Sequence, residues 1–186
     1  MQSKEFMLGL TDFSARFSYT IHHPNMRHKV LPRAGLLKYQ KGRYAILLED
    51  QEIYYDKAEI WTWFKADKEV SVQTLDPEEG WNLEQLFKLY EVAEKPRYLG
   101  LDTIQGASCF KIAISVDKPD LDYNRATLWI REDPKIFQQA TIVDRRGTET
   151  TYTFFDHRLN PGFPASDFRF NPASHPEVLV IDERTR

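Results

Sequence analysis

The sequence has one cysteine, no excess of basic charge and no long apolar run, and each of these shortages excludes a class of protein. A lone Cys109 cannot form an internal disulfide or a cysteine-based zinc site. With 25 Lys and Arg against 28 Asp and Glu, the net charge of -3 gives no support for nucleic-acid binding. No segment approaches the roughly 20 apolar residues that a membrane-spanning helix needs.

Motifs for catalysis and metal binding are equally scarce. His22, His23 and His28 form the only histidine cluster, and adjacent residues of a strand point to opposite faces, so they are poorly placed to share a metal. There is no Gly-rich phosphate loop and no G-x-S-x-G elbow. Cys109 lies in the apolar run SCFKIAI, which favours a buried hydrophobe over a catalytic thiol. We therefore expect no catalytic residue, metal or cofactor.

Short runs of alternating apolar and polar residues make up most of the chain. Residues 15–22 alternate as a strand with one wet face does, and Lys41-Gly42 joins two further runs, 35–40 and 43–49, as a hairpin. Other strands are expected at residues 52–55, 60–64, 68–74, 98–101, 108–116, 126–131, 136–144, 149–155 and 177–182. The pattern predicts one domain, residues 1–186, with about ten or eleven antiparallel strands.

Two segments have helical rather than strand periodicity. Residues 3 to about 13 predict a short helix, and DPEEGWNLEQLFKLYEVAE predicts a longer one. In the longer segment Leu83, Leu86, Phe87 and Tyr90 follow the spacing i, i+3, i+4, i+7 and form one apolar stripe. The fold class is therefore mainly β with helices, of the α+β type.

Aromatic residues make up 13% of the chain, and the stretch EIYYDKAEIWTWF is apolar on both sides of its expected hairpin. In an ordinary half-buried hairpin, apolar and polar residues would alternate. A second apolar face indicates either an aromatic-rich core or the wall of a cavity, and the pattern does not decide between them. The N-terminal MQSKEFMLGL is too short and too charged for a complete secretory signal, which leaves cytoplasmic and periplasmic locations open.

Four segments, in the same order along the chain, resemble the periplasmic outer-membrane lipoprotein carrier family, the LolA-like proteins. They are DFSARFSYT, the strand GLLKY at Gly35–Tyr39, the hairpin from Asp56 to Trp63, and the C-terminal DFRFNPASHPEVLVID. The segments YLGLDTIQGASCFKI and TLWI are similar to the Bacteroidetes-type branch of that family.

The resemblance implies an unclosed antiparallel β-barrel of about eleven strands, with a helical lid over its concave face. It further implies a monomeric periplasmic carrier, its signal sequence removed, that shuttles acylated lipoproteins between membranes. The expected partners are an inner-membrane lipoprotein-releasing ABC transporter and an outer-membrane acceptor, and no nucleic acid.

The same resemblance assigns residues to the acyl-chain cavity. The expected wall comprises Phe17, Tyr19, Leu37, Tyr39, Tyr44, Ile46, Trp61 and Trp63, and the expected lid Leu83, Leu86 and Phe87. Ile60 and Phe64 should then point outward. The family's well-studied branch has an arginine that holds the lid, where this chain has Lys41-Gly42 followed by Arg43. Lys41 and Arg43 are the candidates for that latch, although a lysine cannot make a bidentate contact.

Two other functions compete with the carrier. A sensor domain could use the same groove to detect mislocalised lipoproteins, although such sensors usually carry a second domain. A lipid-acting hydrolase would need a nucleophile and a base, and the sequence offers no recognisable pair.

Overall fold

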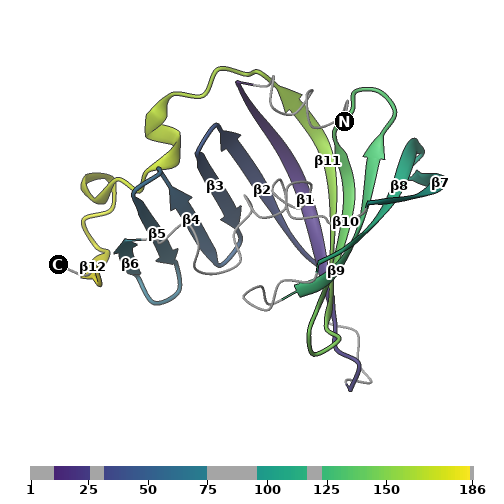
Figure 1. Cartoon of the computed structure of the whole chain (residues 1–186). Helices are drawn as coiled ribbons and strands as arrows, with labels where there is room; N and C mark the ends of the chain where they lie inside the picture. Colours follow the sequence, from purple (N-terminus) through teal and green to yellow (C-terminus); the bar gives the residue numbers. More distant parts are fainter. Residues whose placement is uncertain (1–10, 26–31, 75–95, 117–122, 185–186) are drawn as a thin grey trace. The chain divides into compact units, whose positions relative to one another are not determined.

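The computed structural model describes residues 11–25, 32–74, 96–116 and 123–184, and most of them lie in strands (Figure 1). The strands are β1 (Asp12–His22), β2 (Arg33–Gln40), β3 (Arg43–Leu48), β4 (Gln51–Tyr55), β5 (Glu59–Phe64), β6 (Glu69–Thr74), β7 (Arg97–Ile104), β8 (Ala107–Ser115), β9 (Tyr123–Arg131), β10 (Phe137–Asp144), β11 (Glu149–Leu159) and β12 (Leu179–Asp182). Two short 3-10 helices, η1 (Ala165–Phe168) and η2 (Pro172–Ser174), precede β12.

The strands form one twelve-stranded sheet in the order β12-β6-β5-β4-β3-β2-β1-β11-β10-β9-β8-β7. The end strands β12 and β7 each have one paired neighbour in this order, so the sheet is unclosed, as predicted. Neighbouring strands pair antiparallel from β2 to β6 and from β7 to β11. Strand β12, in contrast, pairs parallel to β6, with Leu179 opposite Glu69. The purely antiparallel prediction was wrong at this strand, because the chain crosses the sheet before it adds its last strand.

The predicted strands and turns are confirmed with small shifts in their ends. Gly42 and Gly147 have φ values of 74° and 83°, which suit glycine in the two hairpin turns. The predicted N-terminal helix fails at its end, where Asp12 and Phe13 already belong to β1. Phe13 shares one face of that strand with the buried Ala15 and Phe17. Its residues 3–10 and the helix predicted over Leu83–Tyr90 lie outside the described residues, and so does the predicted lid.

The chain divides into two compact units, which we describe separately. The β7–β10 unit contains those four strands with residues 17–22 of β1 and 149–155 of β11. The β2–β6 unit contains those five strands, β12, both 3-10 helices, and the remaining residues of β1 and β11.

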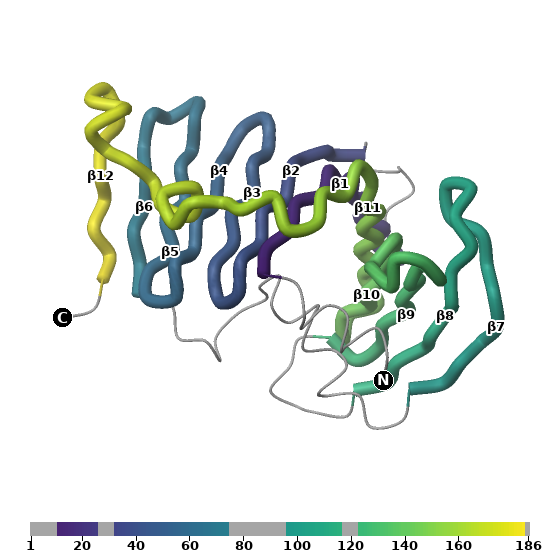
Figure 2. The backbone as a smooth tube through the Cα atoms, turned by 90° about the horizontal axis from the view of Figure 1, so that it is seen from above, coloured from purple at the N-terminus to yellow at the C-terminus, as the bar shows by residue number. Residues whose placement is uncertain are grey.

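In the β2–β6 unit the C-terminal segment, residues 160–178, crosses the strands β2 to β6 before it joins β12 (Figure 2). Its start is fixed by Asp12, which is 1% exposed and accepts the backbone N–H groups of Gly162 and Phe163 at 3.2 and 2.8 Å. Further along, Lys38 Nζ donates to Asp167 at 2.7 Å. Buried acceptors of this kind hold a loop in one place because an unpaired buried carboxylate would be costly.

The C-terminal segment also covers one apolar face of the β4–β5 hairpin. Phe170 is 6% exposed, and its ring centroid lies 6.2 Å from that of Trp61 and 5.5 Å from that of Trp63. The ring centroid of His175 lies 4.4 Å from that of Trp63. The second apolar face of EIYYDKAEIWTWF is therefore packed against the chain's own C-terminal residues.

A charged contact closes the turn of the same hairpin. The Arg169 guanidinium donates to Asp56, which also accepts the backbone N–H groups of Ala58 and Glu59. Burial alone would raise the pKa of the Asp56 carboxyl. The hydrogen bonds from Arg169, Ala58 and Glu59 outweigh burial and hold this pKa below its ordinary value.

This depressed pKa predicts a pH-dependent contribution to stability. The ionised Asp56 stabilises the folded state above the ordinary aspartate pKa, and the contribution disappears as the pH falls through the lower folded-state pKa. At neutral pH we expect Asp56→Asn to lower the free energy of unfolding by about 1 kcal/mol. Urea denaturation of both proteins from pH 7 down to about 3 should show the difference shrinking below about pH 4. A difference that grows with acidity would contradict this role.

Candidate functional site

The β7–β10 unit has one continuous apolar face. Directly paired residues lie on the same side of a sheet, and the register places Ile112, Leu128, Ala140 and Tyr152 in one row across β8, β9, β10 and β11. Rows on either side add further apolar residues: Phe110 with Ile130, and Ile114 with Ala126 and Ile142. We call this surface the apolar wall.

The N-terminal strand extends the apolar wall with aromatic rings. The ring of Tyr152 lies 5.7 Å from that of Tyr19 and 6.5 Å from that of Phe17, and Phe17 lies 6.2 Å from Phe154. Burial, with Tyr19 nearby, raises the pKa of the Tyr152 hydroxyl well above its ordinary value, so Tyr152 stays neutral. The wall is therefore uncharged at physiological pH.

The side chains of the apolar wall are not all sealed in the interior. Leu128, Ala140 and Ile114 are at most 1% exposed and form its base. Tyr19, Phe110, Ile112 and Tyr152 are only half-buried. Half-buried apolar side chains around a sealed base can contact an apolar ligand without first unfolding the sheet.

The opposite face of the same strands is polar. Trp129 Nε1 donates to Asp102 Oδ2 at 2.9 Å, Lys111 Nζ lies 3.4 Å from the same oxygen, and the hydroxyls of Thr141 and Thr151 lie 2.9 Å apart. This face therefore carries charged and hydrogen-bonding side chains beside the buried Cys109, Trp129 and Val143, whereas the apolar wall carries no charged residue.

The structure separates the sequence-predicted wall residues between the two units. Phe17 and Tyr19 lie on the apolar wall of the β7–β10 unit. Leu37, Tyr39, Tyr44 and Ile46 belong to the β2–β6 unit, where Leu37 pairs with Ile46 and Tyr39 with Tyr44 on one face. Leu37 and Tyr44 are 1% and 2% exposed. Their predicted contact with acyl chains stays a prediction.

Trp61 and Trp63 do not share the face of Tyr44 and Ile46. Tyr44 pairs with Tyr55 and Tyr55 with Ile60, whereas Trp61 pairs with Tyr54 on the other side of β4. The prediction that placed both tryptophans in one wall with Tyr44 is therefore corrected. The reason is register: when both faces of a hairpin are apolar, alternation cannot tell which face is which. Ile60 lies on the face opposite the tryptophans, as predicted, and its outward position stays a prediction.

The structure describes the two latch candidates, Lys41 and Arg43, but not the lid residues that they were expected to hold. Lys41 is exposed in the β2–β3 turn, and Arg43 Nη1 donates to Gln40 Oε1 at 2.9 Å. Gln40 in turn donates to the Phe163 carbonyl at 3.0 Å, so Arg43 supports the C-terminal segment. The lid residues Leu83, Leu86 and Phe87 lie outside the described residues, and contact between them and Lys41 or Arg43 stays a prediction.

Sequence reasoning did not assign Phe110, Ile112, Tyr152 or Phe154 to the site. The signal was present in SCFKIAI and TYTFF, where apolar residues alternate with smaller or polar ones. Cys109 is fully buried, as expected, and burial raises the pKa of its thiol, which disfavours the nucleophilic thiolate. Within the described ranges, no three His, Cys, Asp or Glu side chains are grouped as a metal site would require.

Among the helical turns that the structure describes, none has the length and apolarity to cross a bilayer.

A comparison with curated protein sequences gave no match. A family model described as predicted periplasmic protein (DUF2092) matches residues 85–179, just over half of the chain. The chain belongs to the DUF2092 family. The matched residues include all of β7 to β11, which carry most of the apolar wall.

Membership of DUF2092 places the protein in the periplasm. This confirms the periplasmic location that the sequence resemblance implied. The Bacteroidetes-type branch of the LolA-like family stays a prediction.

Solved structures with similar folds share little sequence with this DUF2092 protein. An uncharacterized conserved protein from Thermus thermophilus matches with a TM-score of 0.63 and 9% identity over 98% of this chain and 100% of that one. A putative outer membrane lipoprotein-sorting protein domain from Vibrio parahaemolyticus has a TM-score of 0.49 and 13% identity, over 90% and 93% of the two chains. A LolA superfamily protein from Nitrosomonas europaea has a TM-score of 0.47 and 9% sequence identity, over 91% of this chain and 94% of that one. The Thermus likeness is one of fold alone.

Proposed function

We propose that this DUF2092 protein is a periplasmic carrier that binds the acyl chains of lipoproteins and moves them from the inner to the outer membrane. The observation that carries the proposal is the apolar wall, an uncharged surface built from alternate residues of β8 to β11 and β1. Acyl chains need no catalytic group and only an apolar lining, which fits the lack of a recognisable catalytic motif.

The energetics suit reversible carriage. Each methylene removed from water contributes about 0.8 kcal/mol, so ten methylenes against the wall would contribute about 8 kcal/mol. That free energy corresponds to a Kd of about 1 µM before the costs of association are subtracted. An acceptor that offers a larger apolar surface could then remove the cargo. The transporter and the acceptor remain those that the family resemblance implies.

The proposal predicts that the purified protein keeps a triacylated lipoprotein soluble. Incubation with lipoprotein-loaded vesicles, followed by sedimentation and size-exclusion chromatography, should yield a soluble one-to-one complex. The same lipoprotein with its acyl chains removed is the matched control, and it should not co-elute with the carrier. If the lipoprotein stays entirely with the vesicles, the carrier function is wrong.

A further inference from the structure

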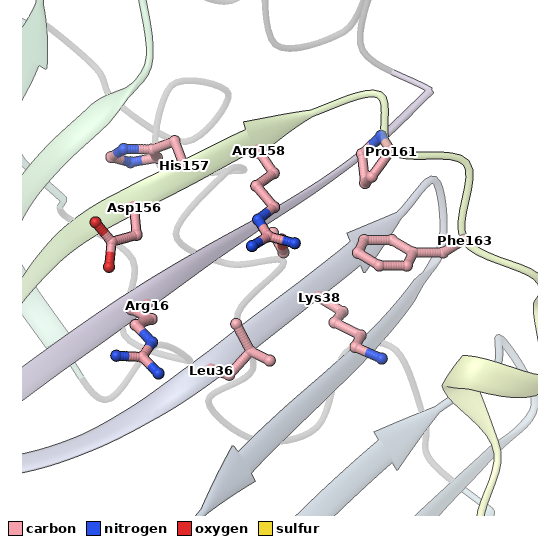
Figure 3. Close-up of a pocket in the computed structure, with 9 residues that line it drawn as sticks. Arg16, Leu36, Lys38, Asp156, His157, Arg158, Pro161 and Phe163 are labelled. Carbon is pink, nitrogen blue, oxygen red and sulfur yellow. The ribbon is translucent and has the colours of Figure 1, made fainter.

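The β2–β6 unit contains a pocket of about 680 Å³, which is lined entirely by residues of that unit and by none of the apolar wall. Figure 3 shows side chains from β1, β2, β11 and the start of the C-terminal segment around this opening. The lining residues are Ser14, Arg16, Leu36, Lys38, Asp156, His157, Arg158, Pro161 and Phe163. We call it the β1–β2–β11 pocket.

The pocket has more basic than acidic residues, whereas the chain as a whole has more acidic than basic ones. Arg16, Lys38 and Arg158 face one acidic residue, Asp156, in a protein whose net charge is -3. Lys38 is paired with Asp167 at 2.7 Å. Arg16 and Arg158 make no ion pair or hydrogen bond with any residue that the structure describes. Two guanidinium groups are therefore available to an anionic ligand.

Strand geometry explains why these side chains meet. Ser14 and Arg16 are two apart on β1, and Leu36 and Lys38 are two apart on β2, so each pair projects from one face of its strand. On β11 the φ of Asp156 is 52°, a left-handed conformation that interrupts the alternation. Asp156, His157 and Arg158 can consequently all line the same pocket.

The pocket also has a fixed apolar side. Phe163 is held by its backbone N–H, which donates to the buried Asp12 carboxylate at 2.8 Å. Lys38 Nζ lies 5.2 Å from the centroid of the Phe163 ring, and Leu36 and Pro161 add further apolar surface. A ligand that fits must therefore combine an oxyanion with an apolar group.

We propose that the β1–β2–β11 pocket binds a phosphate monoester or diester that carries an apolar substituent. Arg16 and Arg158 contact the phosphate oxygens, because the planar guanidinium matches phosphate geometry in a bidentate contact. Leu36, Pro161 and Phe163 pack against the substituent. The same chemistry occurs in anionic phospholipid headgroups and in soluble organic phosphates. This site is independent of the proposed acyl-chain carriage.

The test is a calorimetric titration of the full chain with phenyl phosphate, with phenol and inorganic phosphate as the two half-ligands. We expect saturable binding of phenyl phosphate, at least tenfold tighter than that of either half-ligand. Arg16→Gln and Arg158→Gln should each weaken binding about tenfold, and Arg125→Gln, an exposed arginine on β9, should leave it unchanged.

Replacing the acidic residue of the pocket, Asp156, should strengthen binding of phenyl phosphate rather than weaken it. Asp156→Asn removes the one carboxylate that lines the pocket, and asparagine tolerates the left-handed backbone, so we expect binding a few-fold tighter. Three results would each overturn the proposal. The first is no saturable binding of phenyl phosphate, and the second is inorganic phosphate bound as tightly as phenyl phosphate. The third is a loss of affinity in the Arg16 and Arg158 variants that is no larger than the loss in Arg125→Gln.

Vesicles distinguish the two sources of the phosphate. If the natural ligand is a lipid headgroup, phosphatidylglycerol vesicles should bind the protein, phosphatidylcholine vesicles should not, and Arg158→Gln should abolish the difference. Phenyl phosphate binding without vesicle binding assigns the pocket to a soluble ester. Neither result depends on acyl-chain binding at the apolar wall, so the two proposals can fail separately.

Discussion

Replacing Phe170 by alanine should lower the free energy of unfolding by about 3 to 5 kcal/mol. The ring is 6% exposed and lies within 6.4 Å, between ring centroids, of Tyr54, Trp61 and Trp63. Its removal would leave a cavity between the C-terminal segment and the β4–β5 hairpin, and aromatic contacts worth about 0.5 to 1.5 kcal/mol each would be lost. Urea denaturation followed by tryptophan fluorescence measures this change.

Phe64 supplies the matched control for that measurement. It lies on β5 one residue after Trp63, but 39% of it is exposed. Phe64→Ala should therefore cost only about 1 to 2 kcal/mol, because part of its surface stays in water and its removal leaves no enclosed cavity. Equal losses for the two variants would mean that the C-terminal segment does not pack on the hairpin as described.

Much of the fold could be predicted because the strands alternate and their turns contain characteristic residues. The run from Ala15 to His22 and the turn at Lys41-Gly42 were specified by local sequence. The parallel pairing of β12 with β6 was not, because it joins residues over 100 positions apart and no local pattern records that contact. Contacts of this kind depend on packing of the whole sheet.

The site was predicted less completely, for a physical reason visible at the tryptophans. Trp61 and Trp63 carry a strong apolar signal, but hydrophobicity alone does not say whether a ring will contact a ligand or another part of the chain. Phe170 and His175, far away in the sequence, occupy the space beside them. Conversely, nothing in the run SCFKIAI marks Ile112 as a site residue. Its place on the apolar wall follows only from its alignment with Leu128 and Tyr152 across the sheet.

The second large expected effect concerns acyl-chain binding to the apolar wall. Ile112 and Ala113 are adjacent on β8, and the register places them on opposite faces, Ile112 beside Leu128 and Ala113 beside Thr127. Both side chains are half-buried, so both positions can accept a longer side chain without filling a sealed core. Ile112→Glu puts a charge on the apolar wall, whereas Ala113→Glu puts the same charge on the polar face.

A charge on the wall must be desolvated when an apolar ligand covers it, which costs several kcal/mol. We therefore expect Ile112→Glu to weaken binding of a fluorescent fatty acid by at least about a hundredfold. Ala113→Glu should bind as the unaltered protein does. Circular dichroism and urea denaturation of both variants verify that each is folded under the conditions of the titration.

The most direct measurement of the central claim is this paired titration, with the Kd of the fatty acid determined for the unaltered protein, Ile112→Glu and Ala113→Glu. Acyl-chain binding at the apolar wall predicts saturable binding to the unaltered protein, its loss in Ile112→Glu and its retention in Ala113→Glu. Equal binding by all three proteins, or no saturable binding by any of them, would contradict the claim.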